Sequence, residues 1–460
     1  MKKTALLLAL VLILSAALSS CQMIESAISS IEDMTGIKIN LGKTPEPRSA
    51  AELFQVMNET MDGLESFQDT MSASFDLVVS ENPITSSSTG TSIYINTPGE
   101  EYFYNCVTTE TSTTSPKTQS ETNTEMTVYD DGKLYVANTH NDSESKLCSD
   151  ISFEDFLEYY SDSETDNLLA ETFNSATDTH FEKKEDGSWT LEFSKVSESV
   201  VSSFADEVGF DEDLFGVELK DISIKFEIDE EFRATKISTY FYSDPDADPL
   251  IETVSEYSNF NSASKVEFDK EEYTKVFDAR IPRMTTDYIN EFTLSDVGDA
   301  IVGITTKESI GTDNIHFENT DGNLSFTINS VVDNVKSSTE YANGKVTVTS
   351  NGKVVTEELS DTEAKALLMQ IFTQFCFDEH EIIDVQRIGD STYSVSSRMV
   401  SPSKFGFSIG THTTCYPKYV VKIVDKEVIY LKISLQLTTF YIGNPVKYSV
   451  DISIYFNPEQ

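Results

Sequence analysis

The chain has 460 residues, of which 78 are acidic and 33 basic, and its formal net charge is −45 at pH 7. Charge of this sign argues against nucleic acid as a partner and against electrostatic docking on anionic lipid, because both are themselves negative. Hydrophobic residues make up 39 % of the sequence, which is enough to build packed cores and argues against global disorder. The length allows two or three domains.

The N-terminus carries the features of an export signal. Lys2 and Lys3 precede residues 4–18, which are almost wholly apolar. This run is shorter than the about 20 residues that a membrane-spanning helix needs, and it fits the hydrophobic region of a secretory signal.

Leu18-Ser19-Ser20-Cys21 follows directly and resembles the bacterial lipobox, in which an aliphatic and two small residues precede a cysteine. The resemblance implies a bacterial lipoprotein with a signal peptide at residues 1–20 and acyl chains of the palmitate type attached through Cys21. The membrane is then a partner through this anchor, and the location is the cell membrane on its extracytoplasmic face. The alternative is an ordinary cleaved signal with a chance cysteine.

Residues 21–48 are expected to be a lipid-anchored tether, since Pro45 and Pro47 interrupt regular structure. A helix is predicted to begin at Ser49-Ala50-Ala51-Glu52, where serine and glutamate can form a capping box. From Met71 to Val79, apolar residues alternate with small or polar ones, which is typical of a half-buried strand.

Further helices are predicted near residues 153–174, at 197–208 and after the capping box Ser360-Asp361-Thr362-Glu363. Strands dominate elsewhere. Several dipeptides between them favour type I′ hairpin turns and hence antiparallel sheets, namely Asp131-Gly132, Asp186-Gly187, Asp321-Gly322, Asn343-Gly344 and Asn351-Gly352. Residues 108–127 are mostly Ser and Thr, which predicts a long hairpin excursion or a mobile loop, with an extended polar edge strand as the alternative.

The two halves of the chain show the same order of patterns. Each has a strand that follows a glycine turn, a capped helix and a closing strand, which ends at Asn259-Phe260-Asn261 in the first half and at Tyr455-Phe456-Asn457 in the second. We therefore expect an α+β protein of two tandem domains, residues 49–280 and 281–460, the second a degenerate repeat of the first. Each would be a curved antiparallel sheet with helices packed on one, concave, side. The alternative is two unrelated β-rich halves with common hairpin chemistry.

Apart from Cys21, each half contains two cysteines, Cys106 and Cys148 in the first and Cys376 and Cys415 in the second. In an exported chain each pair could form a disulfide, although sequence does not fix the connectivity. Separate reduced, packed cysteines are the alternative.

Zinc is a weaker alternative in the second half. Cys376 with His380, and His412 with Cys415, offer two thiolates and two imidazoles, the donor set of a tetrahedral zinc site. The spacing fits no common zinc module, so we expect no metal or other cofactor.

The search for catalytic motifs is negative. The sequence contains no GxSxG, HExxH, P-loop or strand-linked GxGxxG pattern, so we expect no enzyme.

The helix-to-strand segment AELFQVMNETMDGLESFQDTMSASFDLVVS (51–80) and the order of elements are similar to the LolA and LppX/LprG lipoprotein carriers, and to uncharacterised surface lipoproteins of Gram-positive bacteria. The resemblance implies a non-catalytic surface lipoprotein that binds a lipid or other apolar ligand between sheet and helices. The alternative is a surface scaffold or interaction lipoprotein with filled cores and no small-molecule ligand.

Overall fold

The computed structural model describes residues 46–79, 82–113, 119–141, 143–161, 165–207, 217–244, 247–307, 309–320, 323–405, 414–441 and 444–458. The predicted signal peptide, Cys21 and most of the predicted tether lie outside these residues. The Asp321-Gly322 turn and His412 also lie outside them.

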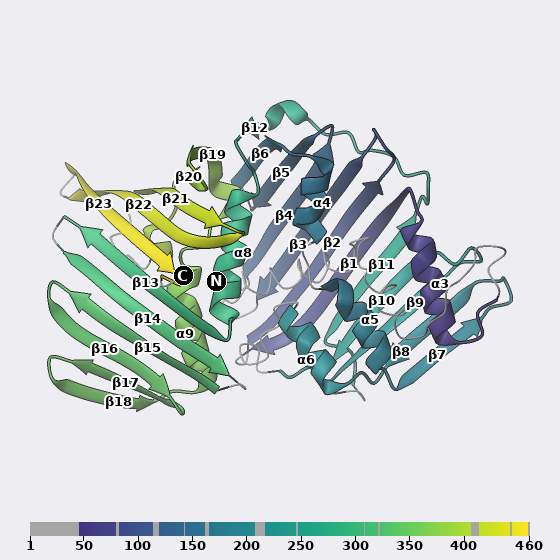
Figure 1. Cartoon of the computed structure of the whole chain (residues 1–460), viewed down its shortest axis with the longest axis horizontal. Coiled ribbons are helices and arrows are strands. Elements are labelled where there is room, and N and C mark those ends of the chain that lie inside the picture. Colours follow the sequence, from purple (N-terminus) through teal and green to yellow (C-terminus); the bar gives the residue numbers. More distant parts are fainter. Residues whose placement is uncertain are drawn as a thin grey trace. The chain divides into compact units, whose positions relative to one another are not determined.

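The expected α+β class is wrong. Of the described residues, strands hold 56 % and helices 19 %, and the strands form two large sheets of twelve and eleven strands (Figure 1). The protein is mostly β, with few helices, and is not a set of helices packed on the concave side of a sheet. Segments rich in Ser and Thr account for much of the difference, because they extend as strands, which threonine tolerates well.

The first sheet has the order β12-β6-β5-β4-β3-β2-β1-β11-β10-β9-β8-β7. Its strands are β1 (Ser66–Val79), β2 (Asn82–Ile95), β3 (Tyr102–Thr113), β4 (Gln119–Asp130), β5 (Lys133–His140), β6 (Ser143–Asp150), β7 (Asp178–Lys183), β8 (Trp189–Ser194), β9 (Asp221–Ile228), β10 (Ala234–Tyr242), β11 (Ile251–Ser258) and β12 (Thr274–Lys275).

The second sheet has the order β18-β17-β16-β15-β14-β13-β23-β22-β21-β20-β19. Its strands are β13 (Val297–Thr306), β14 (Ile310–Thr320), β15 (Asn323–Val332), β16 (Val335–Ala342), β17 (Lys345–Ser350), β18 (Lys353–Glu358), β19 (Ile382–Gly389), β20 (Thr392–Ser397), β21 (Thr414–Val424), β22 (Glu427–Tyr441) and β23 (Asn444–Phe456).

The helices are short. They are α3 (Ala50–Asp62), α4 (Phe153–Ser161), α5 (Thr165–Ser175), α6 (Glu198–Glu207), α8 (Ile281–Leu294) and α9 (Asp361–Thr373), with 3-10 turns η1 (Lys270–Glu272), η2 (Glu379–Glu381) and η3 (Pro402–Phe405). The sequence analysis did not anticipate α8, although Pro282 in its first turn and Ile281, Ile289 and Phe292 at helical spacing are visible in the sequence.

Two compact units divide the chain. The first consists of Met1–Asp142 and Ile151–Asp269, and the second of Ser143–Asp150 and Lys270–Gln460. The second unit therefore starts before the expected boundary at 280/281 and also includes the segment that forms β6. A boundary drawn at a single point of the sequence could not anticipate this.

The two sheets share one strand order. The six strands β1 to β6 lie side by side in sequence order. The strands β7 to β11 follow on the other side of β1, and β11 pairs with β1. β13 to β18 and β23 repeat this arrangement, with β23 paired to β13. A tandem duplication would produce this order, and the duplication itself stays a prediction.

An asparagine closes each sheet in the same way. The Asn261 N–H donates to the Ser66 carbonyl at 2.7 Å, and the Asn457 N–H donates to the Asp299 carbonyl at 2.8 Å. Both asparagines have positive φ, 53° and 44°, which this residue type tolerates better than most. Each fastens the end of the closing strand to the first strand of its own sheet.

Local signals place the turns and the helix starts. Asp131-Gly132, Asn343-Gly344 and Asn351-Gly352 all have positive φ at both positions, as type I′ turns require. The Ser49 hydroxyl accepts from the Glu52 N–H at 3.2 Å, and Ser360 with Glu363 forms a complete capping box.

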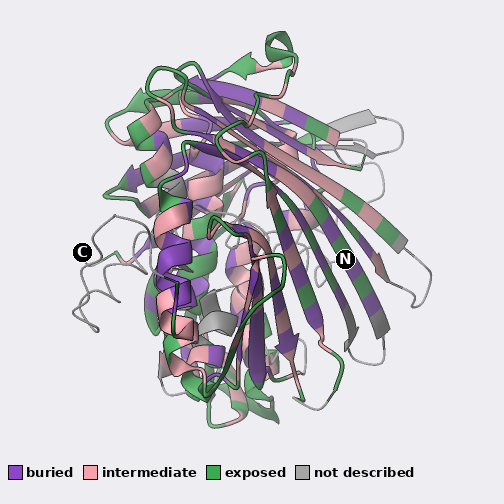
Figure 2. Cartoon of the chain, turned by 90° about the vertical axis from the view of Figure 1, so that its right-hand side faces the viewer, coloured by how far each residue is buried: buried purple, intermediate pink, exposed green. Residues whose placement is uncertain are grey.

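The core of the first unit lies between α3 and strands β8 and β9. Buried residues alternate with less buried ones along β8, and most residues of β9 are buried. Figure 2 shows bands of buried, intermediate and exposed residues along the strands. The Phe54 ring stacks on Phe173 with centroids 4.5 Å apart and meets the rings of Phe193 and Phe226 edge-on. Aromatic pairs in these geometries contribute about 0.5–1.5 kcal/mol beyond their buried area. In the second unit, Phe292 of α8 contacts the rings of Phe317, Phe372 and Phe456.

Candidate functional site

The four cysteines that the structure describes are free thiols, so neither of the disulfides considered from the sequence is formed. Cys106 lies on β3, Cys148 on β6, and Cys415 on β21, while Cys376 follows α9. Burial raises the pKa of Cys376 to about 12 and that of Cys415 to about 11. Thiols held in the protonated state are poor nucleophiles and poor metal ligands.

The zinc alternative gains no support from the geometry. Among the described residues, no group of three or more His, Cys, Asp and Glu side chains is placed to hold a metal. Cys376, His380 and Cys415 therefore do not form such a group, and the fourth candidate, His412, lies outside the described residues.

Charged groups lie around these thiols in the second unit. Lys404 of η3 forms an ion pair with Asp378. Burial raises the pKa of Glu381 to about 7, and the nearby Asp378 carboxylate adds to this effect. The ring centroids of Tyr419 and Phe377 are 4.4 Å apart, and burial raises the pKa of Tyr419 well above its usual value. The raised pKa values of Cys376, Cys415 and Tyr419 favour the protonated forms of these groups at neutral pH.

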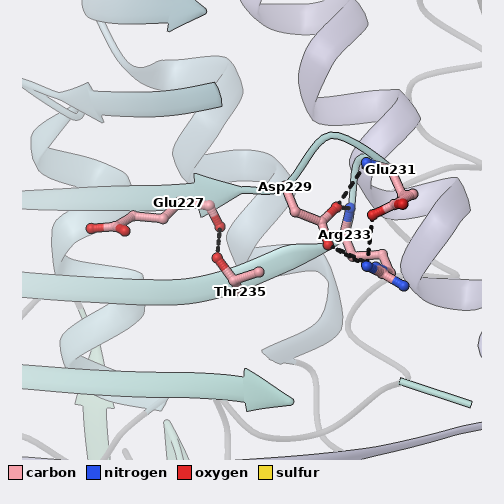
Figure 3. Close-up of polar contacts among 5 residues, drawn as sticks. All are labelled: Glu227, Asp229, Glu231, Arg233 and Thr235. Atoms are coloured by element: carbon pink, nitrogen blue, oxygen red, sulfur yellow. Dashed lines mark hydrogen bonds and ion pairs between the residues drawn. The ribbon is translucent and has the colours of Figure 1, made fainter. Parts of the chain in front are cut away.

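A hairpin clamp is a second polar cluster, in the first unit (Figure 3). Arg233 donates to Asp229 and Glu231 at the turn between β9 and β10, and its guanidinium lies 4.7 Å from the centroid of the Phe260 ring. Backbone N–H groups of Glu231 and Arg233 also donate to Asp229. All its charges are used in fixing the turn, so we assign it a structural role.

A buried hydroxyl ladder joins β2 and β3 in the first unit. The side-chain oxygens of Ser86 and Thr111 are 3.0 Å apart, and those of Ser88 and Thr109 are 2.6 Å apart. The β2–β3 register places the members of each pair directly opposite one another. On the β1 side, Ser86 and Ser88 lie opposite Phe75 and Ala73, whereas on the β4 side Thr109 and Thr111 lie opposite Asn123 and Glu121.

Asp69 of β1 is the most unusual residue of this face. It is completely buried, and neither carboxylate oxygen has a hydrogen-bond partner. Burial raises its pKa to about 8, so the carboxyl is mostly protonated at neutral pH. Ser92 lies opposite it on β2, and the Ser92 hydroxyl donates to the Asn105 side chain at 3.1 Å.

A pocket of about 450 Å³ opens at one end of β1 to β4. Its lining is rich in hydroxyls and comprises Ser74, Phe75, Thr85, Ser86, Ser87, Glu110, Thr111, Ser112, Ser120, Pro249, Leu250 and Glu252. Across the strands, Glu252, Ser74, Ser87 and Glu110 are successive partners in the register. At about 4.8 Å per strand, the backbones of Glu252 and Glu110 are about 14 Å apart, with Ser74 and Ser87 between them.

This pocket was not anticipated from the sequence. The signal was present, because NPITSSSTGTSIYI (82–95) and the Thr-rich start of 108–127 place hydroxyls at nearly every position and so on both faces of these strands. Of the two readings of 108–127, the structure shows the hairpin, formed by β3 and β4 inside the sheet.

No family model matches the chain, and no curated protein matches it. Among solved structures, a putative AttH from Nitrosomonas europaea is 6 % identical, covers 84 % of this chain and 92 % of its own, and has a TM-score of 0.14. A porin-like protein from Bacteroides uniformis is 8 % identical, covers 84 % and 96 %, and has a TM-score of 0.12. OccK5 from Pseudomonas aeruginosa is 8 % identical, covers 85 % and 98 %, and has a TM-score of 0.14. Likeness at this level carries no argument about function.

Within the described part of the chain, none of the helices combines the length and apolar character that crossing a bilayer requires.

Proposed function

We propose that this chain is a non-catalytic surface lipoprotein, anchored through Cys21, that meets its partner at the hydroxyl-lined pocket of the first unit. This is the interaction alternative considered from the sequence. The observation that carries it is the contrast between a packed apolar interior and a polar pocket.

The packing around α3 favours this proposal over a lipid carrier. An acyl chain between helix and sheet would need an apolar space there. Instead, the Phe54 ring touches rings from α5, β8 and β9, and Leu53 and Met57 of α3 are buried in the same cluster. Interiors packed in this way leave few voids larger than a water molecule. Lipid binding stays a prediction that this packing does not favour.

The chemistry of the pocket indicates what the partner presents. Glu110 and Glu252 are exposed acceptors, and the hydroxyls between them can donate or accept. A partner with cationic or hydroxyl groups would complement them, whereas an acyl chain would leave them unsatisfied.

A site-directed photocross-linker tests this proposal on intact cells. Ser87→Cys in the full chain places a label at the pocket, and Glu192→Cys on β8 is the matched control, because both residues are exposed. We expect an adduct of defined mass from the first variant only, and its yield should fall when Glu110→Gln and Glu252→Gln are added. Equal adducts from both labelled positions, or none from Ser87→Cys, would contradict the proposal.

A further inference from the structure

The edges of the two sheets differ in how they are protected. β12 is two residues long. β19 has two irregularities in its pairing with β20, and the Phe277 N–H donates to its Val385 carbonyl at 3.0 Å. β7 carries ion pairs at both ends, Lys183 with Glu46 and Lys195 with Asp178. Short, bulged, charged or covered edges of this kind resist pairing with another chain.

β18 is longer than β12 and, unlike β19, has no irregularity in its pairing; three of its residues, Lys353, Glu357 and Glu358, are charged. All six of its residues, Lys353 to Glu358, are exposed, and its pairing with β17 is regular over its whole length. It is the last strand of the second sheet. A regular, exposed edge strand is a template for a further strand.

The hairpin turn determines which backbone groups β18 offers. In the Asn351-Gly352 turn, Ser350 and Lys353 are the outer residues, which exchange hydrogen bonds in a two-residue hairpin. Because hydrogen-bonded and non-hydrogen-bonded pairs alternate in an antiparallel ladder, Val355 and Glu357 also bond to β17. The N–H and C=O groups of Val354, Thr356 and Glu358 therefore point away from the sheet.

β18 is complementary to itself in one of the registers that these groups allow. If Val354 bonds to Thr356 of a second, antiparallel copy, then Val355 lies opposite Val355 of that copy. Lys353 lies opposite Glu357 of the second copy, and the reverse pair forms at the other end. The strand thus offers two charge pairs around one apolar contact, and opposite charges in facing positions stabilise a strand pair.

The side chains involved share the face of the sheet that becomes the core. Ile315, Ile328, Thr339, Val348 and Val355 are successive partners across β14 to β18. Exposure rises along this row, from 3 % at Ile315 to 39 % at Val348 and 55 % at Val355. In the register above, the row would continue into its symmetric copy without a change of face.

We infer that β18 pairs with β18 of a second copy of this chain, so that two molecules associate through the edge of their second sheets in a two-fold dimer. A symmetric partner is favoured because only a strand with the reverse charge order satisfies Lys353 and Glu357 together, and β18 read backwards has that order. The inference goes beyond the proposed function and does not depend on the pocket of the first unit.

A disulfide across the two-fold axis tests the inference. Facing Val355 residues would form a non-hydrogen-bonded pair, with Cα atoms about 4.5 Å apart, within the range that a disulfide accepts. In the full chain expressed in cells, Val355→Cys should give a covalent dimer on a non-reducing gel under mild oxidation. Val354→Cys is the matched control, because it faces Thr356 and not itself, and it should give at most about a tenth as much dimer.

Charge reversal on the Val355→Cys background supplies the second arm. Lys353→Glu or Glu357→Lys alone should lower the dimer yield roughly tenfold, because each converts two attractive pairs into repulsive ones. The two changes together should restore it. Equal yields from Val354→Cys and Val355→Cys, a failure of the double reversal to restore the dimer, or a cross-link to a different protein would overturn the inference.

Discussion

The inner faces of the two sheets differ at equivalent strands. In the first unit, β2 and β3 carry the hydroxyl pairs Ser86–Thr111 and Ser88–Thr109. In the second, the corresponding strands β14 and β15 pair Ile315 with Ile328 and Phe317 with Phe326. Strand order is the same in β1 to β11 and in β13 to β23, yet these two equivalent strand pairs carry hydroxyls in one sheet and apolar side chains in the other. Turns and closing residues fix the topology, and the chemistry of each face can vary independently of it.

Removing the central aromatic ring of the first core should give the largest effect. Phe54→Ala should lower the free energy of unfolding of the first unit by about 3–5 kcal/mol, because it leaves a cavity among three rings. Trp189 is the chain's one tryptophan and is buried in this core, so its fluorescence reports this unit. Phe292→Ala in the second unit is the control. Equal shifts of the Trp189 transition in both variants would contradict separate cores.

The buried Asp69 carboxyl should make the stability of the first unit depend on pH. Its folded pKa of about 8 lies above the usual aspartate value of 3.8, so the folded state binds the extra proton between these values. Stability should therefore fall as pH rises from about 4 to about 8. Asp69→Asn removes the penalty and should stabilise the chain by about 1–3 kcal/mol at pH 7.

Thermal unfolding at pH 5.5, 7 and 8.5, followed by Trp189 fluorescence, measures this dependence. The gain from Asp69→Asn should be smaller at pH 5.5 than at pH 8.5. A gain that is constant across this range would show that the buried carboxyl does not titrate as described.

The closing asparagines test whether the two units are equivalent. Asn261→Ala and Asn457→Ala should each cost about 1 kcal/mol, because alanine is strained at positive φ and cannot replace the side-chain bond. Asn→Gly at each position keeps the backbone conformation and isolates the side-chain contribution. The bond from the Glu65 N–H to Asn261 is 2.8 Å and the bond from the Asp299 N–H to Asn457 is 3.4 Å, so the side chain should matter more in the first unit. Chemical denaturation measures both losses of stability, and a larger loss for Asn457→Ala than for Asn261→Ala would contradict this expectation.

The hydroxyl ladder should give the smallest net effect. Thr109→Val alone leaves the buried Ser88 hydroxyl without its partner and should cost about 1 kcal/mol. Adding Ser88→Ala should recover part of this cost, because no unsatisfied hydroxyl remains. A double-mutant cycle measures the coupling, and strict additivity would contradict a mutually satisfied pair.

Local patterns predicted local structure well. The turns at Asp131-Gly132, Asn343-Gly344 and Asn351-Gly352 and the Ser360 capping box depend on a few adjacent residues, and they form as predicted. At Asp186-Gly187 only the glycine has positive φ, so the predicted type I′ turn is wrong there. The predicted α+β fold class was wrong. Capping signals predicted helices that are short in the structure, whereas Ser- and Thr-rich segments form long strands. Neither β6 in the second unit nor the burial of Asp69 could be predicted, because both depend on contacts between residues distant in the sequence.

Native mass spectrometry of the full chain extracted from membranes tests the central claim most directly. A surface lipoprotein with filled cores should carry the acyl modification on Cys21 and no further bound lipid. A stoichiometric, non-covalently bound acyl species on the wild-type chain would contradict the account and favour a lipid carrier.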